Sequence, residues 1–179
     1  MTIAKEVAIG VIEANPDVRF CLSKFNDRGL NGGAEIVINC QLPVVAPGQT
    51  QSPIVKSINT LTAEAWTPLA EAYYEVIRYF AGMSSAYNTG VNYSSPIQYR
   101  CQKNFTIVLT DGRPYQELSF PLTGDMEDVL PISSQNYDVT DDDNPESKRT
   151  HQSEWLDDFA KYAWLSLIHI SEPTRPSQI

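Results

Sequence analysis

Two side chains that carry oxygen atoms, Thr67 and Asp111, have the positions expected of cation ligands. Thr67 precedes Pro68 at the start of a predicted helix, and Asp111 follows the apolar run Phe105–Thr110. If both lie at the carboxyl edge of one parallel sheet, their hydroxyl and carboxylate oxygens suit Mg²⁺ or Ca²⁺, which prefer oxygen ligands. Each residue also has an ordinary explanation, because Thr caps helices and Asp-Gly forms turns. The two together, in this order, indicate a metal site more strongly than either does alone.

The 179 residues contain few residues or motifs that could support other kinds of chemistry. The sequence has no G-x-x-x-x-G-K-[ST] phosphate loop, no G-x-G-x-x-G turn, no G-x-S-x-G nucleophile elbow and no H-E-x-x-H motif. Two His and three Cys leave zinc sites and His-dependent triads with few candidates. We therefore expect a protein that is not an enzyme.

The charge balance argues against polyanionic partners. The chain carries 22 acidic and 13 basic side chains, a net charge of -9, and no cluster of Lys and Arg. Nucleic acid and an anionic membrane surface are therefore not the expected partners. No stretch approaches the roughly 20 apolar residues that a membrane helix needs, so no membrane span is expected.

Hydrophobic periodicity and turn signals predict the elements that must position the two oxygen ligands. Helices are expected over residues 1–14, 67–81 and 154–164, and strands over 18–25, 34–40 and 105–110. The first two strands should pair across a hairpin at 26–33, and residues 41–53 should form a surface connection. The helix over 67–81 should begin with Thr67 as its cap. Its apolar face is predicted to consist of Leu69, Tyr73, Val76, Ile77 and Phe80.

This order of elements predicts an α/β fold, a doubly wound, mostly parallel sheet flanked by helices and lacking its first strand. Phe105–Thr110 should be a central strand buried on both faces. Residues 113–153, rich in charge and proline, should form an acidic insertion at the carboxyl edge of the sheet. Leu165–Arg175 (LSLIHISEPTR) closely resembles the translation of a transposase adapter used in sequencing libraries. We therefore expect a partial domain over 1–164 and a non-native tail over 165–179.

Several segments of the chain resemble a known family. WTPLAEA at 66–72 and FTIVLTDG at 105–112 are similar to the von Willebrand factor A domain. Longer pieces (NPDVRFCLSKFN, LTAEAWTPLAEAYYEVIRYFAG, YRCQKNFTIVLTDGRP and WLDDFAKYAW) resemble the N-terminal region of the type IV pilus assembly and tip-adhesin family, the PilC and PilY group. The resemblance, which covers nearly all of residues 3–164, implies pilus biogenesis and adhesion at the pilus tip or outer surface of the bacterial envelope. It implies pilus subunits or host-surface proteins as partners.

The resemblance also implies a metal-ion-dependent adhesion site. Thr67 would supply the second-loop hydroxyl and Asp111 the third-loop carboxylate for Mg²⁺ or Ca²⁺. The first segment of such sites, D-x-S-x-S, does not occur in the chain. In these domains that segment ends the strand before the first helix, which is where this sequence begins. We therefore expect the fragment alone to bind the cation weakly or not at all.

The three cysteines give separate expectations. Cys21 lies inside an apolar run and is expected to be a buried small hydrophobic residue. Cys40 and Cys101 lie at the edges of apolar runs, beside loops. The export that the resemblance implies would permit a disulfide between Cys40 and Cys101.

Two alternatives to an adhesion module remain open. In the first, Asp111 is the acidic residue of a Mg²⁺-dependent phosphohydrolase fragment. In the second, the chain is a metal-free structural interaction module in which Thr67 only caps a helix and Asp111 only forms a turn. Cation binding and phosphatase activity separate these alternatives from the adhesion site.

Overall fold

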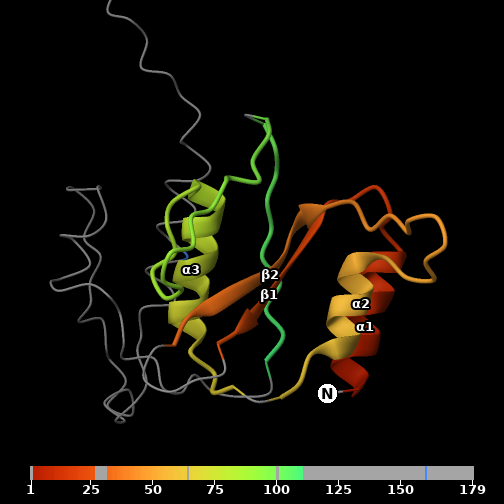
Figure 1. Ribbon diagram of the computed structural model, residues 1–179, viewed down its shortest axis with the longest axis horizontal. Helices are drawn as coiled ribbons and strands as arrows, with labels where there is room; N and C mark the ends of the chain where they lie inside the picture. Colours follow the sequence, from red (N-terminus) through yellow and green to blue (C-terminus); the bar gives the residue numbers. More distant parts are fainter. Residues whose placement is uncertain (1, 27–31, 64, 100, 111–159, 161–179) are drawn as a thin grey trace, which may run out of the picture.

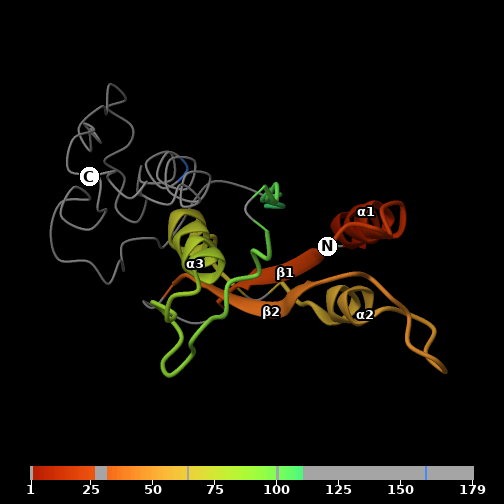
Figure 2. The same cartoon turned by 90° about the horizontal axis from the view of Figure 1, so that it is seen from above.

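The computed structural model describes residues 2–26, 32–63, 65–99, 101–110 and 160. Its named elements are α1 (Thr2–Glu13), β1 (Phe20–Phe25), β2 (Ala34–Gln41), α2 (Pro53–Thr60) and α3 (Leu69–Ala81). The two strands form a hairpin across the middle of the molecule, with α1 and α2 at one end and α3 at the other (Figures 1 and 2). None of the helices in these ranges is both long enough and apolar enough to cross a membrane.

The hairpin of β1 and β2 is antiparallel, as the sequence predicts. Its register pairs Phe20 with Gln41 at one end and Phe25 with Ala34 at the other, with irregularities on either side of Leu22. Beyond the last pair, the Asn26 amide donates to the Gly33 carbonyl at 3.2 Å. The predicted strands over 18–25 and 34–40 and their pairing are therefore confirmed.

Helices α1 and α2 pack against one end of the hairpin. They run in opposite directions (Figure 1), and the Lys5 ammonium near the start of α1 donates to the Asn59 carbonyl near the end of α2 at 2.8 Å. Between them and the strands lies a cluster of four buried residues, Ile12, Ile54, Val55 and Ile58. Burial of one such side chain stabilises the fold by about 1.5–3 kcal/mol. The predicted helix over 1–14 is confirmed, whereas α2 was not predicted.

Helix α3 packs against both strands at the other end of the hairpin. It ends at Gly82, whose φ of 68° is the left-handed conformation that glycine adopts at low cost. The amide of the following residue, Met83, donates to the Arg78 carbonyl at 3.0 Å and closes the last turn. The Tyr79 hydroxyl accepts a hydrogen bond from the Cys40 amide at 3.0 Å, which ties the helix to β2.

The predicted apolar face of α3 was wrong. The fully or nearly fully buried residues of the helix are Ala70, Glu71, Ala72, Tyr74, Glu75, Ile77 and Tyr79, so only Ile77 of the predicted face is among them. The prediction failed because it counted only apolar side chains. The helix instead turns two glutamates inward, and the predicted apolar residues around them are only partly buried.

The predicted fold class is contradicted. In the described part of the chain the sheet has two antiparallel strands, and no parallel, doubly wound sheet is present. The predicted central strand at 105–110 has no strand structure, and Phe105 and Ile107 are 82% and 71% exposed. A buried strand needs backbone partners on its neighbours, and in the described ranges no ladder includes this segment. The expected helix at 154–164, the acidic insertion and the tail lie outside the described residues, apart from residue 160.

Candidate functional site

Thr67 does not cap helix α3. The residue at the cap position is Pro68, and the helix has no side-chain cap hydrogen bond. Thr67 is half-buried, and its carbonyl accepts the Leu69 amide at 2.9 Å. Its hydroxyl makes no hydrogen bond within the described ranges. The predicted capping role was therefore wrong, which leaves the hydroxyl available to a ligand.

The other predicted ligand, Asp111, lies outside the described residues, directly after the exposed Thr110. The predicted approach of Thr67 to Asp111 therefore stays a prediction. Within the described ranges no three His, Cys, Asp or Glu side chains group in a way that could hold a metal ion. The oxygen donors of Thr67 and Asp111 still have the chemistry that Mg²⁺ or Ca²⁺ requires, but two residues make an incomplete ligand set.

The structure pairs Cys21 with Cys40 in a disulfide, and Cys101 is a free, exposed thiol. The predicted pairing of Cys40 with Cys101 was therefore wrong, as was the isolated, buried role predicted for Cys21. The reason is the hairpin register, because pairing Phe20 with Gln41 sets Cys21 opposite Cys40, with Cα atoms 4.1 Å apart. The predicted hairpin already contained this signal, since both cysteines lie near the open ends of its strands.

Sequence reasoning missed two carboxylates, Glu71 and Glu75, which are both 0% exposed on α3. Glu75 Oε1 accepts a hydrogen bond from the Tyr93 hydroxyl at 2.6 Å, and its Oε2 accepts the Ala86 amide at 2.9 Å. Burial of the Tyr93 hydroxyl is the main cause, and its hydrogen bond to Glu75 the second, that raises the pKa of Tyr93 from 10.0 to about 12. Because protein donors engage both of its oxygens, Glu75 holds the loop after α3 in place and is a poor candidate for a metal ligand.

The side chain of Asn88 ties the same loop to the hairpin, because its Nδ2 donates to the Ala34 carbonyl at 2.8 Å. Within the loop, the backbone amide of Asn88 donates to Ser85 Oγ at 2.8 Å. Gly33 allows the loop to approach the hairpin closely. A Cβ at Gly33 would overlap the ring of Tyr87, and Gly33 also has a φ of 79°. The polar network on this side of the molecule is therefore structural.

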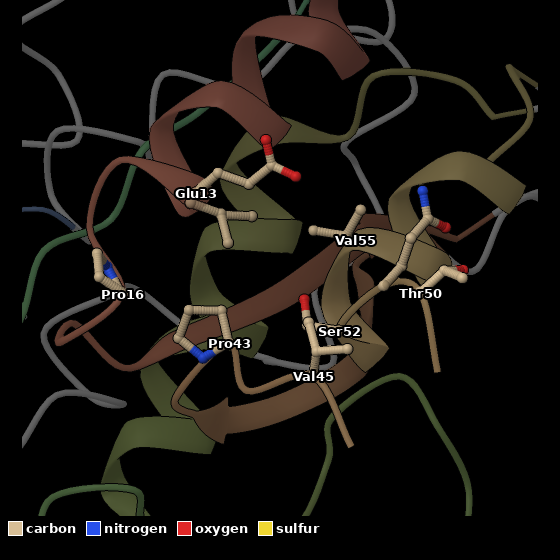
Figure 3. Close-up of a pocket in the computed structure, with 9 residues that line it drawn as sticks. Glu13, Pro16, Pro43, Val45, Thr50, Ser52 and Val55 are labelled. Carbon is tan, nitrogen blue, oxygen red and sulfur yellow. The ribbon is translucent and has the colours of Figure 1, made fainter. Parts of the chain in front are cut away.

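A separate pocket of about 190 Å³ lies where α1 ends and α2 begins (Figure 3). We call it the α1–α2 pocket. It is lined by Ile12, Glu13, Pro16, Pro43, Val45, Thr50, Gln51, Ser52 and Val55. Its walls are mainly apolar, and its polar groups come from the two helix ends and the connection between β2 and α2. No sequence motif indicated it, because its residues come from three separate segments.

Compared with family models, with curated proteins and with solved structures, the chain has no match in any of the three. The resemblance to the von Willebrand factor A domain and to the pilus family therefore rests on the quoted sequence segments alone.

Proposed function

We propose that the chain is part of a type IV pilus biogenesis and tip-adhesion protein. In this proposal it is not an enzyme, and it binds pilus subunits or host-surface proteins through a metal-ion-dependent adhesion site. The support is the resemblance of the segments around Thr67 and Asp111. The observation that carries the proposal is the Thr67 hydroxyl, which makes no helix cap, so the ordinary explanation for a Thr at this position does not apply.

The chemistry of the proposed site is that of a hard cation. Thr67 and Asp111 would hold Mg²⁺ or Ca²⁺ together with further ligands of the D-x-S-x-S type, a motif that residues 1–179 do not contain. When bound, such a cation offers a coordination position to an acidic side chain of the partner, which is a strong charge-assisted contact. The role of Thr67 is to fix one side of the site from the connection that leads into α3.

The disulfide between Cys21 and Cys40 supports the proposed location in the bacterial envelope. Disulfides persist in oxidising compartments such as the periplasm and the cell surface, and they are rare in the reducing cytosol. An exported adhesion module fits that chemistry.

Calorimetric titration of Mg²⁺ and Ca²⁺ into the full-length protein tests the proposal. We expect binding heat that Thr67→Val and Asp111→Asn each reduce by at least about tenfold in affinity, since each removes a ligand. Thr60→Val and Asp17→Asn are matched controls at exposed positions, and both should keep the heat of the unmodified protein. Partner binding should be lost in a chelator and should return with added cation.

Two results would contradict the proposal. Absence of cation heat in the full-length protein would favour a metal-free structural module. Hydrolysis of p-nitrophenyl phosphate that needs Mg²⁺ and disappears in Asp111→Asn would favour a phosphohydrolase.

A further inference from the structure

The α1–α2 pocket lies between two helix ends of opposite polarity. Because α1 and α2 run antiparallel, the carboxyl end of α1 at Glu13 meets the amino end of α2 at Pro53 (Figure 1). A helix carries partial negative charge at its carboxyl end and partial positive charge at its amino end. The two helix ends therefore give the pocket a partly negative side and a partly positive side, independently of any charged side chain.

The positive side of the pocket has unused hydrogen-bond donors. Ser52 is only 3% exposed and lines the pocket, yet its hydroxyl makes no cap bond to α2. Figure 3 shows the Ser52 oxygen directed into the space between the lining side chains. The Val55 amide in the first turn, which a capping Ser would normally engage, also finds no acceptor within the described ranges. A hydroxyl without a cap bond, beside a free amide at a helix start, is a site for a carboxylate.

The negative side of the pocket is Glu13. Glu13 lines the same pocket from the end of α1, across from Ser52 in Figure 3, and its carboxylate forms no ion pair within the described residues. It stands at the carboxyl end of α1, where a cation is favoured over an anion. This side of the pocket therefore suits an ammonium group.

The walls between the positive side at Ser52 and the negative side at Glu13 are apolar. Ile12, Pro16, Pro43, Val45 and Val55 supply them. The volume of about 190 Å³ is close to that of an apolar cavity of about 150 Å³ that holds a benzene molecule. The pocket thus has room for one branched or aromatic side chain.

We propose that the α1–α2 pocket binds a free α-amino acid with an apolar side chain. The carboxylate of the ligand accepts from the Ser52 hydroxyl and the Val55 amide, its ammonium donates to Glu13, and its side chain packs against the prolines and valines. A zwitterion of this size satisfies both poles at once. An amine or a carboxylate alone satisfies only one of them. This site is independent of the proposed adhesion function.

The test is a calorimetric or NMR titration of the 179-residue protein with L-leucine and three analogues. Leucinamide lacks the carboxylate, N-acetyl-leucine lacks the ammonium, and glycine lacks the apolar side chain. We expect L-leucine to bind and each analogue to bind at least about tenfold more weakly, because each loses one of the three contacts. Ser52→Ala and Glu13→Gln should weaken L-leucine binding by a similar factor.

Matched variants make the test specific. Ser57→Ala lies on α2 and Glu6→Gln lies on α1, both away from the pocket lining, and neither should change the affinity. Val45→Trp, at a half-exposed wall position, fills the pocket without altering either pole and should abolish binding. Thermal unfolding of each variant shows whether it is folded. Absence of L-leucine binding at about 10 mM, which is weaker than about -3 kcal/mol of binding free energy, would overturn the proposal. Equal affinity for leucine and leucinamide, or unchanged binding in Ser52→Ala, Glu13→Gln and Val45→Trp, would also overturn it.

Discussion

Replacing Cys21 with Ser should lower the free energy of unfolding by about 3 kcal/mol. The disulfide joins residues 19 apart in the sequence. The chain-entropy relation for a loop of that length gives about 11 cal/mol/K, which is about 3 kcal/mol at 25 °C. Since about 1 kcal/mol moves the midpoint of a chain of this size by about 2–4 °C, the midpoint should fall by roughly 6–12 °C.

Thermal unfolding followed by circular dichroism without reductant measures the change. Cys101→Ser is the matched control, because Cys101 is exposed and outside the disulfide, and it should alter stability by no more than about 0.5 kcal/mol. The reduced unmodified protein should show the same loss as Cys21→Ser. If Cys101→Ser loses the stability while Cys21→Ser keeps it, and mass mapping without reductant links Cys40 to Cys101, the reasoning from the hairpin register is refuted.

The other predictions concern side chains in the two packed regions, and thermal or chemical unfolding measures each of them. Ile54→Ala, at a residue 1% exposed, should cost about 2–5 kcal/mol of stability, and a loss below about 1 kcal/mol would contradict the buried cluster. Tyr93→Phe removes the donor to Glu75 Oε1 and should cost about 1–3 kcal/mol, whereas an unchanged midpoint would show that the bond at 2.6 Å is unimportant. The pKa of Tyr93 is raised to about 12 in the folded protein. The contribution of protonated Tyr93 to the free energy of unfolding is therefore fully present below pH 10 and is lost as the pH rises through 12. The unmodified protein should therefore lose more stability than Tyr93→Phe between these two pH values. Gly33→Ala should cost more than Gly48→Ala, because both have a φ of 79° but only a Cβ at Gly33 meets a neighbouring ring, and equal losses would argue against that contact.

Local sequence signals predicted the first half of the structure well. The helical spacing over 1–14 and the two β-branched, aromatic runs on either side of a Gly-rich turn were enough to predict α1 and the hairpin. Helix α2 was missed because its first residue, Pro53, ends a proline-rich connection, although Ile54, Val55 and Ile58 have the spacing of one helical face.

The remaining expectations depended on contacts that the sequence does not contain. The buried face of α3 could not be predicted from apolar residues, because partners from the loop at 82–93 satisfy the carboxylate of Glu75. The pattern of the apolar run at 105–110 predicts a buried strand, but a strand forms only where neighbouring strands complete its backbone hydrogen bonds. For the candidate site, the sequence identified Thr67 and its neighbours, and it missed the α1–α2 pocket because three distant segments build it.

The disulfide at the open end of the hairpin also fixes which side chains each end of the sheet can present. A slip of one residue between two strands would exchange their faces, turning Leu22 and Ile38 away from the α1–α2 helices and moving Ala34 relative to Asn88. The covalent link between Cys21 and Cys40 prevents that slip while it is intact. A single oxidation event during folding therefore commits both packed ends of the molecule to one alignment, and reduction would release both of them together.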